Sequence, residues 1–252
     1  MVAKRAVLFD LFNTLTRYEP ERIPLVRVRG KERRTTLGVV HRRYRLLGGR
    51  ADFEPFVDAA FRSYQETRVE AKRDLREISC WDRFRRTLEG LGDDPGPRSG
   101  GLALELVNEH MALVIGSATV PASHLEVVDR LRSRFRLGIL SNFDHGPAAR
   151  ALLERSGLAE RFGVVLISDE EGIRKPHPGL FGRLLERVGV ANDEAVYVGD
   201  TPGDDVEGAR LAGIEPIWLN VDGEVYPGEV APFTIRRLTE IESLIESGGP
   251  IP

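Results

Sequence analysis

The chain has 252 residues, of which 41% are hydrophobic and 30% are charged, a composition typical of a globular protein with a full α/β core. The formal net charge of −3 does not indicate a nucleic-acid or membrane partner, and no apolar run approaches the roughly 20 residues that a membrane span needs. One cysteine, Cys80, excludes an internal disulfide, and the first ten residues do not resemble a signal peptide, so we expect a cytoplasmic protein with Cys80 in the core.

The first predicted element is a strand over residues 6–9, an uninterrupted apolar run typical of a parallel strand that is covered on both faces. From residue 18 to about residue 115 the pattern is helical, and we expect no strand in this segment. The helices expected here cover residues 37–47, 53–75, 81–91 and 102–115, with a glycine-rich and proline-rich loop over 92–101.

After Pro121, strands and helices alternate. Strands are predicted at 137–140, 164–167, 195–198 and 216–219, and helices at 123–134, 146–157, 178–188, 205–211 and 238–245, with Ser123 capping the first helix. This alternation predicts parallel βαβ units with right-handed crossovers. The fold class is therefore α/β, a doubly wound parallel sheet with an inserted all-α cap domain. The expected ranges are 1–17 and 118–247 for the core, 18–117 for the cap and 248–252 for a flexible tail.

Four sets of polar residues lie after predicted strands. Three sets follow a strand directly, and the fourth lies in the loop after the strand at 164–167. In an open parallel sheet, ligands lie beyond the carboxyl ends of the strands, so these residues are expected to meet. Each set alone would be an ordinary turn, and it is their conjunction that predicts a site. The sets are Asp10 with Asn13 and Thr14, Ser141 with Asn142, Lys175 with Pro176, and Asp200 with Asp204 and Asp205.

Each of these sets has a chemical interpretation. Asp10 is a candidate nucleophile that would form an acyl phosphate, which water then hydrolyses. Ser141 and Lys175 offer a hydroxyl donor and a cation for a bound phosphate. Asp200, with Asp204 or Asp205, offers the hard oxygen ligands that Mg²⁺ prefers.

The motifs resemble those of the haloacid dehalogenase superfamily of hydrolases. The sequences FDLFNTL at 9–15, LSN at 140–142, IRKP at 173–176 and VYVGDTPGDDVEGA at 196–209 resemble its four motifs in order. The helical segment lies where one group of the superfamily inserts a helical cap. The resemblance implies a Rossmann-like core and a Mg²⁺ cofactor. It also implies three sets of site residues: catalytic Asp10, Ser141 and Lys175; substrate-binding Phe12, Thr14, Ser141, Asn142 and Lys175; and metal ligands Asp10, the Phe12 backbone carbonyl, Asp200 and Asp205.

One residue departs from the family pattern. Phosphatases of this superfamily carry an Asp two residues after the nucleophile as general acid/base, and here that residue is Phe12. Losing such a group typically costs on the order of 10² to 10⁴ in rate. The main interpretation is a Mg²⁺-dependent phosphatase for a small phosphorylated metabolite. The alternatives are a non-catalytic phospholigand-binding or regulatory protein, a phosphonatase using Lys31 or Lys72, and a 2-haloacid dehalogenase, against which the Asp200 cluster argues.

The segment from residue 21 to residue 50 is rich in arginine, with ten basic and two acidic residues. Arg34, Arg42 and Arg45 are expected on a solvated helix face, or alternatively facing the crevice to recognise an anionic group of the substrate. We expect no nucleic-acid or membrane partner, because no aromatic interleaving or known module accompanies the charge. The sequence leaves monomer and homodimer open.

Overall fold

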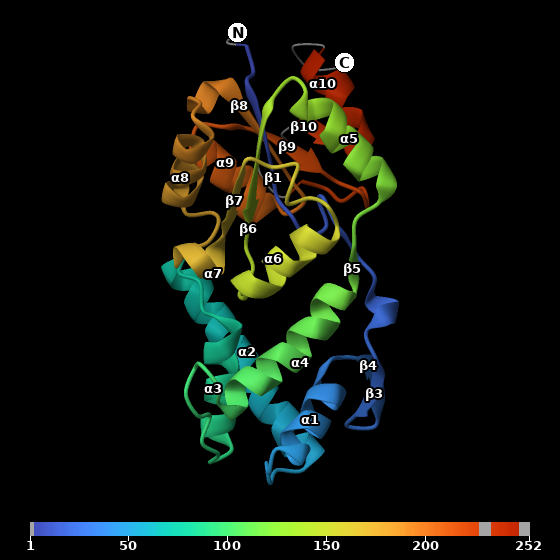
Figure 1. Cartoon of the computed structure of the whole chain (residues 1–252), viewed down its shortest axis with the longest axis vertical. Helices are drawn as coiled ribbons and strands as arrows, with labels where there is room; N and C mark the ends of the chain where they lie inside the picture. The colour runs from blue at the N-terminus through green and yellow to red at the C-terminus, as the bar shows by residue number, and fades with distance from the viewer. Residues whose placement is uncertain (1–2, 227–232, 247–252) are drawn as a thin grey trace.

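The computed structural model describes residues 3–226 and 233–246, and its centre is a six-stranded parallel sheet (Figure 1). The strand order is β10-β9-β8-β1-β6-β7, so β1 lies inside the sheet between β8 and β6. The strands are β1 (Ala6–Phe9), β6 (Arg136–Ser141), β7 (Val164–Ile167), β8 (Ala195–Gly199), β9 (Glu215–Leu219) and β10 (Phe233–Ile235).

Helices cover both faces of this sheet, as the unbroken apolar pattern of β1 predicts. Val7 and Phe9 pack in the hydrophobic cluster that contains Val127 and Leu131 of α5, whereas Leu8 packs in the opposite cluster with Leu184 of α8. The doubly wound α/β prediction is confirmed. The helical elements of this part are α5 (Ala122–Arg132), α6 (Gly146–Arg155), α7 (Ser168–Glu171), α8 (Pro178–Val188), η2 (Asn192–Glu194), the π-helical turn η3 (Pro202–Val206), α9 (Glu207–Leu211), η4 (Leu238–Glu240) and α10 (Ile241–Glu246).

A second, mainly helical part occupies the lower half of Figure 1. Its core is formed by apolar side chains from four helices, with Tyr44, Phe56, Cys80 and Leu106 all fully buried. The buried position of Cys80 agrees with the sequence prediction. The elements are α1 (Leu37–Leu46), α2 (Phe53–Asp74), α3 (Cys80–Gly90) and α4 (Leu102–Gly116), with η1 (Pro20–Arg22) and the short antiparallel pair β2 (Arg17–Tyr18) and β5 (Ala118–Thr119) at its connection to the sheet.

The prediction that this inserted part is all-α was wrong. It contains an antiparallel hairpin, β3 (Leu25–Val28) and β4 (Lys31–Arg34), closed by a turn at Arg29 and Gly30 with φ angles of 48° and 75°. The sequence carries the signals for it, since Val26 and Val28 alternate with charged residues and a glycine follows two positions later. Arg34 therefore lies on a strand and does not share a helix face with Arg42 and Arg45.

Smaller differences concern element ends. Pro121, rather than Ser123, is the N-cap residue of α5, and the sequence analysis missed α7 and β10. The predicted tail at 248–252 lies outside the described residues. Among the described residues, no helix has the length and apolar character of a membrane span.

Candidate active site

The predicted site residues meet beyond the carboxyl ends of three neighbouring strands. Asp10 directly follows β1, Ser141 is the last residue of β6, and Asp200 directly follows β8. Because β1 pairs in parallel with both β6 and β8, the three strand ends lie side by side. The backbone N–H of Asp10 donates to the carbonyl of Val198 at 2.8 Å, which extends the β1–β8 pairing up to the carboxylate.

Lys175 reaches this point from the loop that precedes α8. Its side chain is 2% exposed, and Nζ donates to Asp10 Oδ1 at 2.6 Å, to Asp205 Oδ1 at 2.6 Å and to the Tyr197 hydroxyl at 3.0 Å. These contacts use all three donors of the ammonium group. Although burial opposes its charge, the carboxylates of Asp10 and Asp205 raise the pKa of Lys175 well above its usual value, so the side chain is a cation.

Asn142 holds the backbone on which Lys175 stands. Its Oδ1 accepts from the N–H of Lys175 at 2.8 Å, and its Nδ2 donates to the carbonyl of the same residue at 3.0 Å. The peptide bond between Lys175 and Pro176 is cis. The Asn142 side chain, which the sequence analysis predicts to bind substrate, is therefore bonded to the Lys175 backbone and fixes the position of the lysine.

Tyr197 is a site residue that the sequence analysis missed. Its ring lies in the middle of β8 and is fully buried, and its hydroxyl accepts from Lys175 and lies 3.1 Å from the Leu140 carbonyl and 3.2 Å from Asp205 Oδ1. Burial raises the pKa of this phenol well above its usual value, so it remains a neutral donor. One feature of the sequence could have identified it: a tyrosine inside an otherwise apolar strand has a hydroxyl that needs a buried hydrogen-bond partner.

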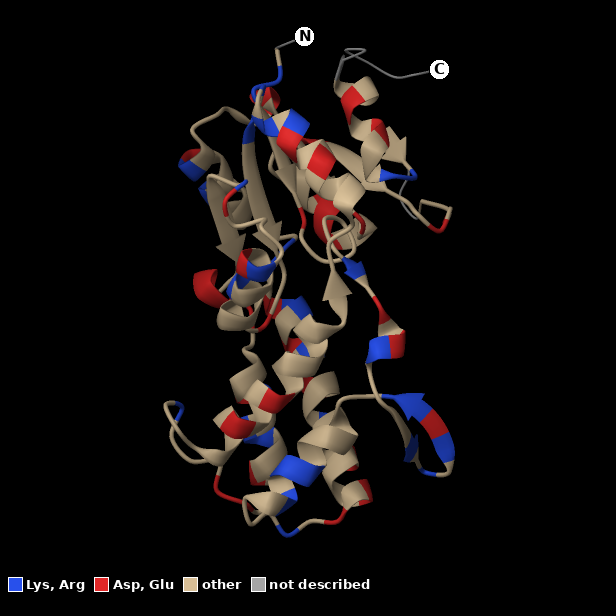
Figure 2. Cartoon of the chain, turned by 45° about the vertical axis from the view of Figure 1, so that its right-hand side comes forward, with Lys and Arg blue, Asp and Glu red and all other residues tan. Residues whose placement is uncertain are grey.

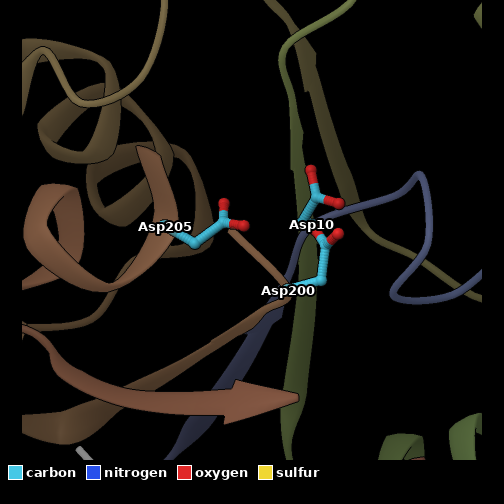
Figure 3. A group of neighbouring side chains, drawn as sticks. All are labelled: Asp10, Asp200 and Asp205. Atoms are coloured by element: carbon cyan, nitrogen blue, oxygen red, sulfur yellow. The ribbon is translucent and has the colours of Figure 1, made fainter. Parts of the chain in front are cut away.

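Three carboxylates form a cluster around the lysine. Asp10, Asp200 and Asp205 each place an oxygen within 4.8 Å of the other two, and their side chains point toward one another in Figure 3. Burial raises the pKa of Asp10, and it raises that of Asp200 to about 6. Lys175 bonds only two of these three carboxylates, so the ionised cluster has an excess of negative charge that a hard divalent cation would balance. The donor set therefore fits Mg²⁺.

The structure separates the two candidates for the last metal ligand. Asp205 is 1% exposed and belongs to the cluster, and its Oδ2 accepts from the N–H of Thr201 at 2.9 Å. Gly199 makes this approach sterically feasible, since a Cβ atom there would overlap the Asp205 side chain. Asp204 instead accepts from Asn142 Nδ2 at 3.1 Å and lies 3.9 Å from the guanidinium of Arg174, outside the cluster.

Two hydroxyl groups of the motifs are buried without a partner. Thr14 Oγ1 and Ser141 Oγ have no hydrogen bond to any described residue, although both residues are fully buried. Leaving a buried polar group unpaired costs about 1–3 kcal/mol, so a bound polar molecule that pairs with these hydroxyls would remove this cost. Both residues were predicted to bind substrate.

Phe12 places an aromatic ring two residues after Asp10. It is partly buried, and its ring stacks on that of Phe143 with centroids 4.5 Å apart and an interplanar angle of 25°. Asn13 beside it has a φ of 60°, which makes the turn after β1 tight. The side chain at this position offers no proton to a leaving group.

The residues next to the motifs have structural positions. Asp144 forms an ion pair with Arg83 of α3 at 2.8 Å, and His145 and His177 are the N-cap residues of α6 and α8. Their side chains are engaged by the backbone or by the inserted part, and they are not members of the carboxylate cluster.

The inserted helical part contacts the loop that carries Lys175. Leu75 and Glu77 form backbone hydrogen bonds with Arg174 and Gly172 at 3.1 and 3.2 Å. The carboxylate of Glu77 also accepts from Ser168 Oγ at 2.5 Å and from Arg174 Nη1 at 3.3 Å. Burial raises the pKa of Glu77. The residues immediately before Lys175 are thus held by the cap side of the molecule.

Residues 4–213 match a family model described as hydrolase, haloacid dehalogenase-like hydrolase. The chain is 31% identical over 224 residues to the ribulose-1,5-bisphosphate 5-phosphatase of Halopiger xanaduensis, covering 87% of this chain and 86% of that protein. It is 38% identical over 137 residues to the phosphoserine phosphatase of Thermus thermophilus, covering 54% of this chain and 53% of that protein, so this match spans about half the length of the relative.

Solved structures share the whole architecture. A 2-haloacid dehalogenase from Pseudomonas syringae pv. Tomato superposes with a TM-score of 0.71 over 98% of this chain and 100% of that chain, at 23% identity. A HAD phosphatase from Thermococcus onnurineus gives a TM-score of 0.64 over 96% of this chain and 97% of that chain, at 25% identity. At 23% identity, the likeness to the dehalogenase shows the fold alone.

Proposed function

Because the chain belongs to the haloacid dehalogenase-like hydrolases and is thus a hydrolase, we propose that it is a Mg²⁺-dependent phosphatase of a small phosphorylated metabolite. The observation that carries the proposal is the cluster of Asp10, Asp200 and Asp205 around Lys175. A dehalogenating site without a metal would leave these carboxylates to repel the charge on Asp10. Relatives named as phosphatases support the same reaction class.

Each motif position has a separate role in the proposed reaction, in which Asp10 is the nucleophile. A carboxylate oxygen of Asp10 attacks phosphorus, and a bond to the leaving oxygen breaks as the aspartyl phosphate forms. The unpaired hydroxyls of Ser141 and Thr14 bind the phosphoryl oxygens. Lys175 holds the attacking carboxylate of Asp10 in place and supplies positive charge beside the phosphoryl group. Water then attacks phosphorus, which releases phosphate and restores the carboxylate.

Asp10, Asp200 and Asp205 are the side chains that would hold Mg²⁺, together with the backbone carbonyl of Phe12. When bound, the ion neutralises phosphoryl oxygens and orients the substrate. Phe12 changes the proton transfers, because the leaving oxygen takes its proton from solvent and water is activated without a neighbouring carboxylate. We therefore expect slow turnover of alkyl phosphates and faster turnover of substrates with good leaving groups, such as acyl or aryl phosphates.

The test is a hydrolysis screen over phosphate esters of graded leaving-group pKa, with and without Mg²⁺. We expect phosphate release that requires Mg²⁺ and Asp10, so Asp10→Asn abolishes it. Phe12→Asp should raise the rate for alkyl phosphates by on the order of 10²-fold or more and change aryl phosphates least.

Other outcomes identify the alternative functions. A wild-type chain that hydrolyses nothing, beside an active Phe12→Asp variant, would refute the proposal and identify a protein that binds phosphorylated ligands without turnover. Halide release from 2-haloacids in the absence of metal would identify a dehalogenase. Borohydride trapping of a substrate on Lys31 or Lys72 would identify a phosphonatase.

A further inference from the structure

A cavity of about 650 Å³ lies within the inserted part, between the β3–β4 hairpin and helix α2. Figures 1 and 2 show the hairpin at the side of the lower half of the molecule, away from the sheet that carries Asp10. The volume is in the range typical of small-molecule sites. The lining residues are Val28, Arg29, Lys31, Arg33, Val57, Asp58, Phe61 and Arg62.

The register of the hairpin turns two cations toward this cavity. Arg33 is paired with Val26, and Lys31 with Val28, so each cation shares a strand face with a valine. Val28 is 5% exposed, and a Cβ atom on Gly38 of α1 would overlap Val26, so this face packs against the helices. Lys31 and Arg33 therefore lie on the same face of the hairpin as these valines and line the cavity, and both side chains remain exposed.

Helix α2 supplies the opposite wall. Val57, Asp58, Phe61 and Arg62 follow the i, i+1, i+4, i+5 spacing of one helical stripe. Val57 is buried, whereas Phe61 is 44% exposed. The cavity thus has an apolar floor with an accessible aromatic ring beside it.

The charge of the cavity is largely uncompensated. Asp58, its one carboxylate, pairs with Arg29 at 2.5 Å. Lys31, Arg33 and Arg62 form no ion pair within residues 3–226 and 233–246. Three free cations around an apolar hollow attract an anion and favour one that also carries a flat apolar group.

We propose that this cavity binds a nucleotide, with the phosphate group on Lys31, Arg33 and Arg62 and the base on the ring of Phe61. A mononucleotide combines the two chemistries that the lining offers, a phosphate anion and an aromatic face. The concave shape favours a small molecule over an extended nucleic-acid strand. The site is separate from the Asp10 cluster and does not depend on its chemistry.

The test is calorimetric titration of AMP into the wild-type chain in EDTA, where no metal-dependent turnover occurs, with inorganic phosphate and adenosine as partial probes. The double variant Lys31→Ala/Arg33→Ala should weaken AMP binding by about tenfold or more. Phe61→Ala should weaken AMP binding several-fold and leave phosphate binding unchanged. The matched control is Arg27→Ala, because Arg27 stands opposite Glu32 in the strand register, on the other face of the same hairpin. It should change AMP binding by less than about twofold.

Three results would overturn the proposal. They are the absence of AMP binding at millimolar concentration, an equal loss in Arg27→Ala, and much tighter binding of a short DNA duplex at the same phosphate concentration. The last result would assign the face to nucleic acid. Thermal denaturation of each variant verifies that a loss of binding does not reflect unfolding.

Discussion

The strand-end cluster and the cavity behind the hairpin both concentrate charge, but they do so in opposite ways. Lys175 is 2% exposed and bonded to Asp10, Asp205 and Tyr197, whereas Lys31 and Arg33 are exposed and form no ion pair with any described residue. A buried charge is fixed in position by its partners and by the packing that excludes water. Exposed charges attract ligands but are only loosely positioned. The comparison indicates that precise chemistry belongs to the cluster and ligand attraction to the cavity.

The largest expected effect comes from removing the buried cation. Lys175→Met leaves Asp10 and Asp205 without their shared partner, and breaking a buried pair in this way typically costs about 3–5 kcal/mol. The control is Lys4→Met, which removes a partly exposed ion pair with Glu215 and should cost less than about 1 kcal/mol. Urea denaturation without metal measures both. Equal losses would show that burial does not distinguish the two lysines.

A smaller effect is expected on the pH dependence of folding stability, with and without Mg²⁺. Burial raises the pKa of Asp200 from 3.8 to about 6, so the metal-free folded chain binds more protons than the unfolded chain between these values. Its stability therefore falls as the pH rises through about 6, by at most about 3 kcal/mol from this group. Mg²⁺ binds the ionised carboxylates, so its stabilising effect should grow over the same range.

Thermal denaturation with and without Mg²⁺ at about pH 5 and about pH 8 measures this dependence. We expect almost no shift in the melting temperature at the lower pH and the largest shift at the higher pH. Asp200→Asn should reduce the Mg²⁺ shift at the higher pH and remove the part of the dependence centred near pH 6, while Asp10, whose pKa burial raises to about 8, maintains a dependence at higher pH. A Mg²⁺ shift that is independent of pH would contradict the assignment of Asp200 as a ligand.

The smallest effect concerns Glu77, at the contact between the two parts. Glu77→Ala leaves the Ser168 hydroxyl and the Arg174 guanidinium without their acceptor, at a cost of about 1–3 kcal/mol. Glu77→Gln keeps an acceptor for Ser168 and for Arg174 and removes a charge whose burial is unfavourable, but it also removes the ion pair with Arg174, which is partly exposed, so we expect a smaller loss than in Glu77→Ala. Denaturant unfolding of both variants checks this, and an equally destabilised Gln variant would show that the charge itself holds the contact.

Much of the site was predictable from the sequence because parallel sheets impose a simple rule. An apolar strand followed by a polar residue identifies a strand end, and parallel strands bring their carboxyl ends to one edge. This rule placed Asp10, Ser141 and Asp200 together. It could not place Tyr197, because a tyrosine within a buried strand contributes to the site only through the packing that directs its hydroxyl.

The inserted part was less predictable. Its helices follow a 3.6-residue period that is legible over 10 to 22 residues, whereas β3 and β4 have four residues each, too few to stand out beside them. The run of arginines also obscured the alternation of Val26 and Val28.

The sequence by itself determined the alternation of the main strands and helices after Pro121, the acid at the end of the first strand and the aromatic residue two positions later. These are local properties, which follow from the spacing of apolar residues along the chain and from the type of each residue. Only the tertiary structure decided that Asp205 rather than Asp204 joins the cluster, that one lysine serves two carboxylates, and that the cations of a hairpin line a cavity. Each of these depends on distances between segments far apart in the chain, which packing sets and local sequence does not.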